Sequence, residues 1–200
     1  MQLFALAAYV LFALADWSAV ARVSKPLEYV AKPAALAALV VYAAAQPVVQ
    51  PWLIAALVLS LLGDVYLMLP VDLFVAGLAS FLLAHLAYVA TFTASTGARA
   101  VAAIAVALLT SPVATRVLRN VDATPVRLAV ASYMLVIALM VGSAIASGGL
   151  VAASGALLFL VSDSLIAWNR FVKPFAGAQA AIMVTYHLAQ LALTLALSAR

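Results

Sequence analysis

The sequence predicts an all-α polytopic membrane protein, with eight transmembrane helices in a single membrane domain over residues 1–200. Of these 200 residues, 69% are apolar and only 8% are charged, and the mean hydropathy is +1.24. A soluble domain carries about a quarter charged residues, so most of this surface must face lipid. No β-barrel alternation is visible, and only helices or closed barrels satisfy the backbone in lipid.

Prolines and short polar breaks divide the chain into apolar runs. Proline lacks an amide donor and disfavours helix in the residue before it, so we place all eight prolines near helix ends. The breaks at 95–97 and 147–149 complete the division, and most runs have the roughly 20 residues that cross the hydrocarbon. The expected helices cover about 3–20, 30–46, 52–69, 72–94, 98–114, 126–146, 149–168 and 175–197.

The first run and the charges exclude several classes of protein. No Lys or Arg precedes residues 3–20 and further runs follow, so we interpret this run as a retained span and not as a signal peptide. The chain has no cysteine, which excludes disulfides and thiolate sites. The net charge of +4 is small and lies in short loops, so we expect a membrane-lipid environment and no nucleic-acid partner.

The loop cations predict an orientation, because cytoplasmic loops carry an excess of Lys and Arg. Only Arg99 and Arg200 fall on the other side of the predicted bundle. We therefore expect both termini outside the cytoplasm, in the bacterial inner (cell) membrane. The predicted cytoplasmic group is Arg22, Lys25, Lys32, Arg116, Arg119, Arg127, Arg170 and Lys173.

The two halves of the chain resemble each other. The segment "ALVLSLLGDVYL" aligns with "GALLFLVSDSLI", and each is followed by a histidine, His85 in the first half and His187 in the second. Because each half holds four predicted helices, 1–95 and 98–198 would be parallel repeats about an axis along the membrane normal.

Two acids lie in these matching segments, surrounded by apolar sequence. Asp64 and Asp163 should both lie about 10 Å from the cytoplasmic end of their helices, and His85 and His187 about 9 Å deeper. A stripe along the fourth helix carries Phe81, His85 and Tyr88 at helical spacing, and the eighth helix carries a similar stripe. The pattern predicts a pocket open toward the cytoplasm, with acids at its mouth and histidines at its floor.

These residues also have other interpretations: a structural role, a metal site or anchoring at the membrane interface. An intramembrane acid marks a functional site by default, but both acids could instead join helices, with Lys32 as a partner. Two Asp and two His suit zinc by ligand type, yet their spacing disfavours a metal site, and we expect neither a metal nor a cofactor. Tyr66, Tyr133 and Trp168 fit the role of interfacial anchors.

At these residues the chain resembles the YhhN-like lysoplasmalogenase family of eight-span membrane proteins. The resemblance runs from about residue 28 to 190 and departs from the family pattern at His187. Matching features are Lys32-Pro33, Gly63-Asp64, Phe74, Gly77, Phe81, His85, Tyr88, Ser162-Asp163, Tyr186 and Gln190.

The resemblance implies a membrane hydrolase that cleaves the vinyl-ether bond of a lysophospholipid substrate, giving a fatty aldehyde and a glycerophospho-base. Protonation of the vinyl ether requires an acid that is protonated near neutral pH, and burial would keep Asp64 or Asp163 in that state. The alternative is a small-molecule or proton-coupled transporter that uses the same acids, and a structural or lipid-binding protein is a third hypothesis. The expected substrate-binding residues are Lys32, Phe81, His85, Tyr88, Ser162, Tyr186, His187 and Gln190, with Lys32, Arg170 or Lys173 near the phosphate.

Overall fold

The computed structural model, which describes residues 1–198, is entirely helical within that range. Each of its helices is long and apolar enough to cross a membrane, so the predicted fold class is confirmed. The eight helices are α1 (Gln2–Ala21), α2 (Lys25–Ala44), α3 (Pro51–Met68), α4 (Phe74–Thr91), α5 (Thr96–Arg119), α6 (Thr124–Ala146), α7 (Leu150–Phe171) and α8 (Ala178–Ser198).

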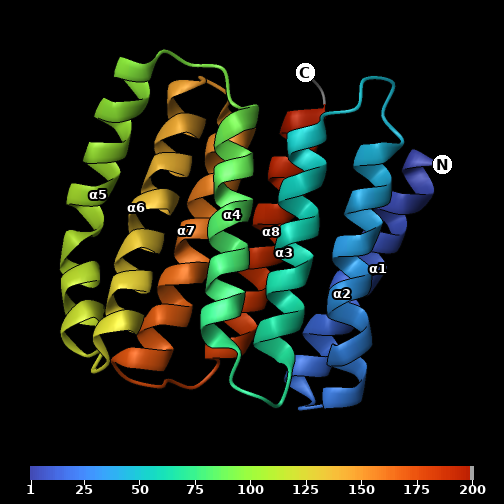
Figure 1. Cartoon of the computed structure of the whole chain (residues 1–200). Helices are drawn as coiled ribbons and strands as arrows, with labels where there is room; N and C mark the ends of the chain where they lie inside the picture. The colour runs from blue at the N-terminus through green and yellow to red at the C-terminus, as the bar shows by residue number, and fades with distance from the viewer. Residues whose placement is uncertain (199–200) are drawn as a thin grey trace.

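Consecutive helices pack as four antiparallel pairs, α1–α2, α3–α4, α5–α6 and α7–α8. Helix α1 begins and α8 ends at one end of the bundle, and the four turns within the pairs lie at the opposite end (Figure 1). We call this opposite end the cation-bearing end, because the predicted group of loop cations lies there. Arg99 lies at the other end, and Arg200 is outside the described residues.

Two helix boundaries, the start of α2 and the end of α5, differ from the prediction because proline does not stop these helices. Helix α2 begins at Lys25, five residues before the predicted start, with Pro26 in its first turn, where the missing amide costs no hydrogen bond. Pro33 and Pro112 lie inside α2 and α5. Pro112 deprives the Leu108 carbonyl of its usual donor, and the Ser111 hydroxyl donates to that carbonyl at 2.8 Å, as serine does in membrane helices.

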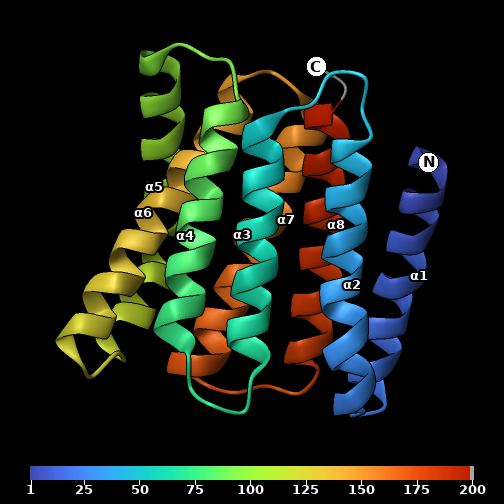
Figure 2. The ribbon, with the colours of Figure 1, turned by 45° about the vertical axis from the view of Figure 1, so that its right-hand side comes forward.

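The contacts of α8 and α4 show where the two halves of the chain meet. Helix α8 contacts α7 and also α1, α2 and α3, whereas α4 contacts α3 and α6. Helix α5 lies at the edge and contacts α6 and α7, and α1 lies at the opposite edge (Figure 2). The two halves of the chain therefore meet at α4–α6 and along α8.

The paired packing is consistent with two four-helix repeats, since α1–α2 and α3–α4 correspond to α5–α6 and α7–α8. The superposition of residues 1–95 on 98–198 stays a prediction, as does the description of 1–200 as one domain.

Candidate functional site

Asp64 lies in the last turns of α3, enclosed by α2 and α8. The Lys32 ammonium is 3.0 Å from its Oδ1 atom, and the Tyr186 hydroxyl donates to its Oδ2 atom at 2.6 Å. Lys32 is 5% exposed and Asp64 is 2% exposed. Because a buried carboxylate is stable only with charge and hydrogen-bond partners, the pairing with Lys32 assigns the ionised form to Asp64.

A chain of side-chain hydrogen bonds continues from Asp64 across the bundle. The Gln190 amide donates to the Tyr186 hydroxyl at 3.3 Å, and the Tyr88 hydroxyl donates to Gln190 Oε1 at 2.5 Å. All of these residues are buried. The chain therefore joins α2, α3, α8 and α4, and it fixes the orientation of Tyr186 against the acid.

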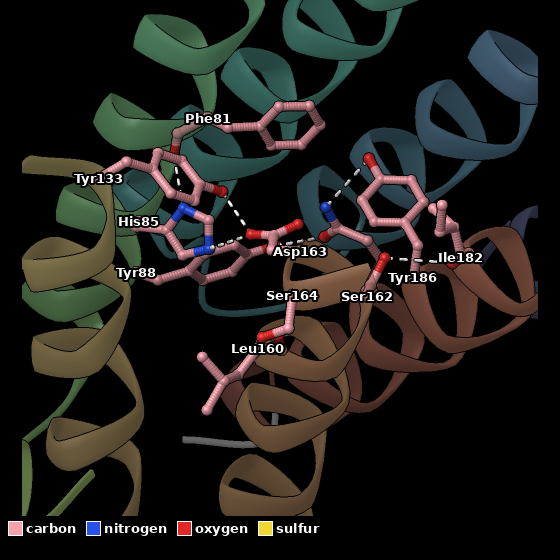
Figure 3. Close-up of polar contacts among 11 residues, drawn as sticks. Phe81, His85, Tyr88, Tyr133, Leu160, Ser162, Asp163, Ser164, Ile182 and Tyr186 are labelled. Atoms are coloured by element: carbon pink, nitrogen blue, oxygen red, sulfur yellow. Dashed lines mark hydrogen bonds and ion pairs between the residues drawn. The ribbon is translucent and has the colours of Figure 1, made fainter. Parts of the chain in front are cut away.

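Asp163 lies on α7 with different partners, which Figure 3 shows together. The Tyr133 hydroxyl donates to its Oδ2 atom, and His85 Nε2 is 3.9 Å from the same atom. His85 Nδ1 is 2.6 Å from the Phe81 carbonyl, which can only accept, so Nδ1 carries the hydrogen. A neutral His85 therefore turns its bare Nε2 atom toward Asp163, and the pair can hold one proton between them.

Aromatic rings connect the two acid sites. Phe159 is fully buried and packs edge-to-face against both His85 and Tyr186, at centroid distances of 4.7 and 5.4 Å. Phe81 packs against Phe159 and Tyr186 in the same way. Its ring also lies directly on Gly63, where a Cβ atom would be 2.6 Å from Phe81 Cδ2. Glycine beside Asp64 therefore lets this ring occupy the space between the sites.

An apolar cavity with a volume of about 80 Å³ reaches Asp163 from the cation-bearing half of the bundle. Its walls come from α3, α4, α5, α6 and α7, and include Phe74, Phe81 and Tyr133. Asp163, Tyr133, Thr110 and Ser164 supply its polar side chains. Asp64 does not line this cavity, although both acids were expected to face one cavity.

The structure brings most of the predicted residues together and leaves Ser162 aside. Lys32, Phe81, His85 and Tyr186 contact an acid or a direct partner of an acid. His187 also packs its ring on that of Tyr186, at 5.6 Å, and Tyr88 joins the same group through Gln190. The Ser162 hydroxyl instead donates to the Ile182 carbonyl, joining α7 to α8. His187 faces α1, where its Nδ1 atom accepts from Trp17 at 2.9 Å and its carbonyl accepts from Tyr9 at 2.5 Å.

Two expectations about position need correction. Lys32 was placed near the phosphate, but its ammonium is buried against Asp64. His85 was expected about 9 Å deeper than the acids, yet it lies against Asp163. Helix α4 begins at Phe74 and α7 extends to Phe171. The helix rise therefore places His85 about 16 Å and Asp163 about 12 Å from the cation-bearing end.

Tyr133 is the site residue that the sequence interpretation missed. We expected an interfacial anchor, but Tyr133 is 7% exposed and bonds Asp163. Its position, nine residues into α6 or about 13 Å deep, is too deep for an anchor, and this depth could have identified it. Within residues 1–198, no group of three or more His, Asp or Glu side chains is placed to hold a metal ion.

The fold and site define a class of protein, an integral multi-pass membrane protein with two acids inside its helix bundle, each bonded by a tyrosine. The chain belongs to the YhhN family, whose model matches residues 27–197. It is 40% identical over 140 residues to "Lysoplasmalogenase TMEM86B" of Homo sapiens, covering 70% of this chain and 60% of the relative. It is 36% identical over 143 residues to the protein of that name from Sus scrofa, covering 72% and 62%.

The chain thus spans about three fifths of the length of the curated relatives it matches. No solved structure matches the chain significantly.

Proposed function

We propose that this protein is a membrane hydrolase that cleaves the vinyl-ether bond of lysoplasmalogens, releasing a fatty aldehyde and a glycerophospho-base. The observation that carries the proposal is the carboxyl group of Asp163 at the wall of an apolar cavity, of which Phe81 is also part. The Phe81 ring lies on Gly63, next to the second acid, Asp64. The names of the relatives supply the reaction, and the site supplies groups that can perform it.

Asp163 is the proton donor in this proposal. It has no ion-pair partner among the described residues except the His85 ring at 3.9 Å, so it can carry a proton without breaking a salt bridge. Proton transfer to the β-carbon of the vinyl ether creates an oxocarbenium ion, while His85 and the Tyr133 hydroxyl stabilise the carboxylate left behind. The cavity volume of about 80 Å³ is below the about 300–1,000 Å³ of a typical ligand pocket, so it encloses the reacting bond and not the whole lipid.

Asp64 is the second acid and works as a carboxylate, because Lys32 neutralises it without protonating it. Its negative charge stabilises the oxocarbenium ion. It also accepts a proton from the water molecule that attacks the cation. The resulting hemiacetal then breaks its bond to the glycerol oxygen: its hydroxyl proton passes to the Asp163 carboxylate, and the leaving glycerol oxygen takes the proton held by Asp64. Both acids return to their starting forms, and one water is consumed for each aldehyde and each glycerophospho-base formed.

The orientation completes the proposal. The cation-bearing end faces the cytoplasm by the positive-inside rule, both ends of the chain lie outside, and the cavity opens toward the cytoplasmic leaflet. We place the protein in the bacterial inner (cell) membrane.

The proposal is tested with purified, folded protein and a lysoplasmalogen in mixed micelles made with deuterated water. We expect equimolar fatty aldehyde and glycerophospho-base, with one deuterium on the carbon next to the aldehyde group. The matched control is the lysolipid with a saturated ether, which cannot form the oxocarbenium ion by protonation and should stay intact. Folded protein that releases no aldehyde would refute the proposal and leave a transporter or lipid-binding protein as the better description.

A further inference from the structure

A second buried polar group lies on the side of Asp64 away from the apolar cavity. It comprises Asp16 on α1 and Glu28 and Lys32 on α2, which are 0%, 5% and 5% exposed. Helix α1 packs on α2 and α8, and α2 packs on α3. None of these three side chains lines the apolar cavity, whose walls come from α3 to α7.

These side chains form a graded series from the cation-bearing end toward Asp64. Lys25, at the exposed start of α2, pairs with Glu28 at 2.7 Å. By helix rise, Glu28 lies about 4.5 Å into α2, Asp16 about 7.5 Å from the end of α1, and Lys32 about 10.5 Å into α2. Lys32 then contacts Asp64 at 3.0 Å. Polar groups therefore continue from the protein surface to the buried carboxylate.

Asp16 is the unusual member of the series. Both of its carboxyl oxygens are buried and have no hydrogen-bond partner among the described residues. It lies within electrostatic range of Lys32, Glu28 and Asp64. His187 Nε2 is also buried without a partner, and it carries the hydrogen, because Nδ1 accepts from Trp17. Buried polar atoms that lack a protein partner are the usual positions of bound water in proteins.

We propose that Asp16, Glu28 and Lys32 line a water channel that leads from the cation-bearing end to Asp64. The proposal rests on the proposed function, because hydrolysis consumes one water in each turnover. Lipid and water then approach by separate routes: lipid reaches Asp163 through the apolar cavity, and water enters along α1 and α2 on the Asp64 side. Separate routes keep the Asp163 cavity apolar while water is still supplied.

Thiol accessibility tests the channel without any reference to catalysis. The chain has no cysteine, so Asp16→Cys introduces a single thiol. Ala156→Cys is the matched control, because Ala156 is 0% exposed and lies on α7, away from α1 and α2. We expect a small water-soluble methanethiosulfonate reagent to modify the Asp16→Cys protein at least about 10-fold faster, since a thiol reacts as the hydrated thiolate.

Equal protection of the Asp16→Cys and Ala156→Cys proteins would overturn the channel, whatever the enzymatic result. Glu28→Cys is a second reporter near the proposed entrance, for use if the Asp16→Cys protein does not purify as a folded species. Modification of the Asp16→Cys protein in a preparation that releases no aldehyde would support the channel and refute only the proposed function.

Kinetics then connect the channel to turnover. Asp16→Leu should lower kcat by about 10-fold or more and leave KM within about 2-fold, since the lipid route is untouched. Asp16→Asn should keep most of the activity, because the amide still binds water. Asp122→Leu, in an exposed loop, is the control for the same change of side chain. An Asp16→Leu protein with unchanged kcat would overturn the proposal.

Discussion

Asp64 and Asp163 occupy similar places in the two halves, but their surroundings differ in charge. Asp64 has a lysine at 3.0 Å and a tyrosine hydroxyl at 2.6 Å. Asp163 has a tyrosine hydroxyl and a histidine ring and no lysine or arginine partner among the described residues. In our proposal this difference gives the two acids different tasks, one held as an anion and the other free to exchange a proton.

The partners also follow the same topological rule. Asp64 on α3 takes Lys32 from α2 and Tyr186 from α8, whereas Asp163 on α7 takes Tyr133 from α6 and His85 from α4. Each acid therefore has one partner from the preceding helix of its own half and one from the last helix of the other half. The divergence between the sites lies in the identity of these partners and not in where they come from.

Removing either acid should have the largest effect on rate. Asp64→Asn and Asp163→Asn each remove an ionisable group and should lower kcat by about 10²- to 10⁴-fold, measured as aldehyde release. Asp122→Asn, in the exposed loop after α5, should retain full activity. Near-normal turnover in folded protein with either substitution would show that this acid is not catalytic.

Substitutions in the two acid sites should differ in how much they lower the free energy of unfolding. Lys32→Met leaves the Asp64 carboxylate buried beside an apolar side chain, and losing one partner of a buried ion pair costs about 3–5 kcal/mol in the free energy of unfolding. Adding Asp64→Asn should restore much of that loss. Asp163→Asn should be far milder, because it leaves no cation without its partner. Equal losses for Lys32→Met and Asp163→Asn, measured by denaturation in detergent, would contradict the assigned charges.

The two tyrosines give a finer comparison. Tyr133→Phe removes the one hydroxyl that bonds Asp163, so we expect kcat to fall about 10-fold, as for the loss of a hydrogen bond to a charged group. Tyr186→Phe should cost less, because Lys32 still contacts Asp64. Tyr42→Phe, away from both acids, is the control. A larger loss for Tyr186→Phe would reverse our assignment of the proton donor.

The smallest expected effect concerns Asp72, an acid outside the membrane helices. The Phe74 backbone amide, and then Arg170 at 3.0 Å, hold the pKa of Asp72 below its ordinary value of 3.8. Because the folded-state pKa is lowered, the stabilisation is fully present above pH about 4 and is lost as pH falls below that value. Asp72→Asn should therefore lower Tm slightly at pH 7, less in high salt, and not at all at pH 2.

The sequence predicts the fold well because composition and loop charges determine it. A chain that is 69% apolar must put its helices in lipid, and the helix pairs and the position of the loop cations follow from short connections. Asp64 and Asp163 could also be predicted, since a carboxyl inside an apolar run needs a reason to be there.

The contacts of the site could not be predicted in the same way. Membrane helices are apolar on every face, so no amphipathic stripe fixes how far α6 rotates and whether Tyr133 points to lipid or to Asp163. The same uncertainty hid the separation of the two acids, because the sequence does not show that the ring of Phe81, an expected substrate-binding residue, lies on Gly63. The prolines led to wrong predicted boundaries for α2 and α5. A proline is tolerated in the first turn of a helix, and a serine hydroxyl can donate to the carbonyl that a proline leaves without its backbone donor.

The exchange of partners between halves has a consequence for biosynthesis. A ribosome makes the chain from α1 to α8, so Asp163 enters the membrane after both His85 and Tyr133 have already been made. Asp64 is made more than a hundred residues before Tyr186, and until α8 is inserted only Lys32 accompanies it. Lys32 therefore neutralises a carboxylate that would otherwise be unpaired in lipid. The insertion of α8 then adds Tyr186 and completes the contacts of Asp64.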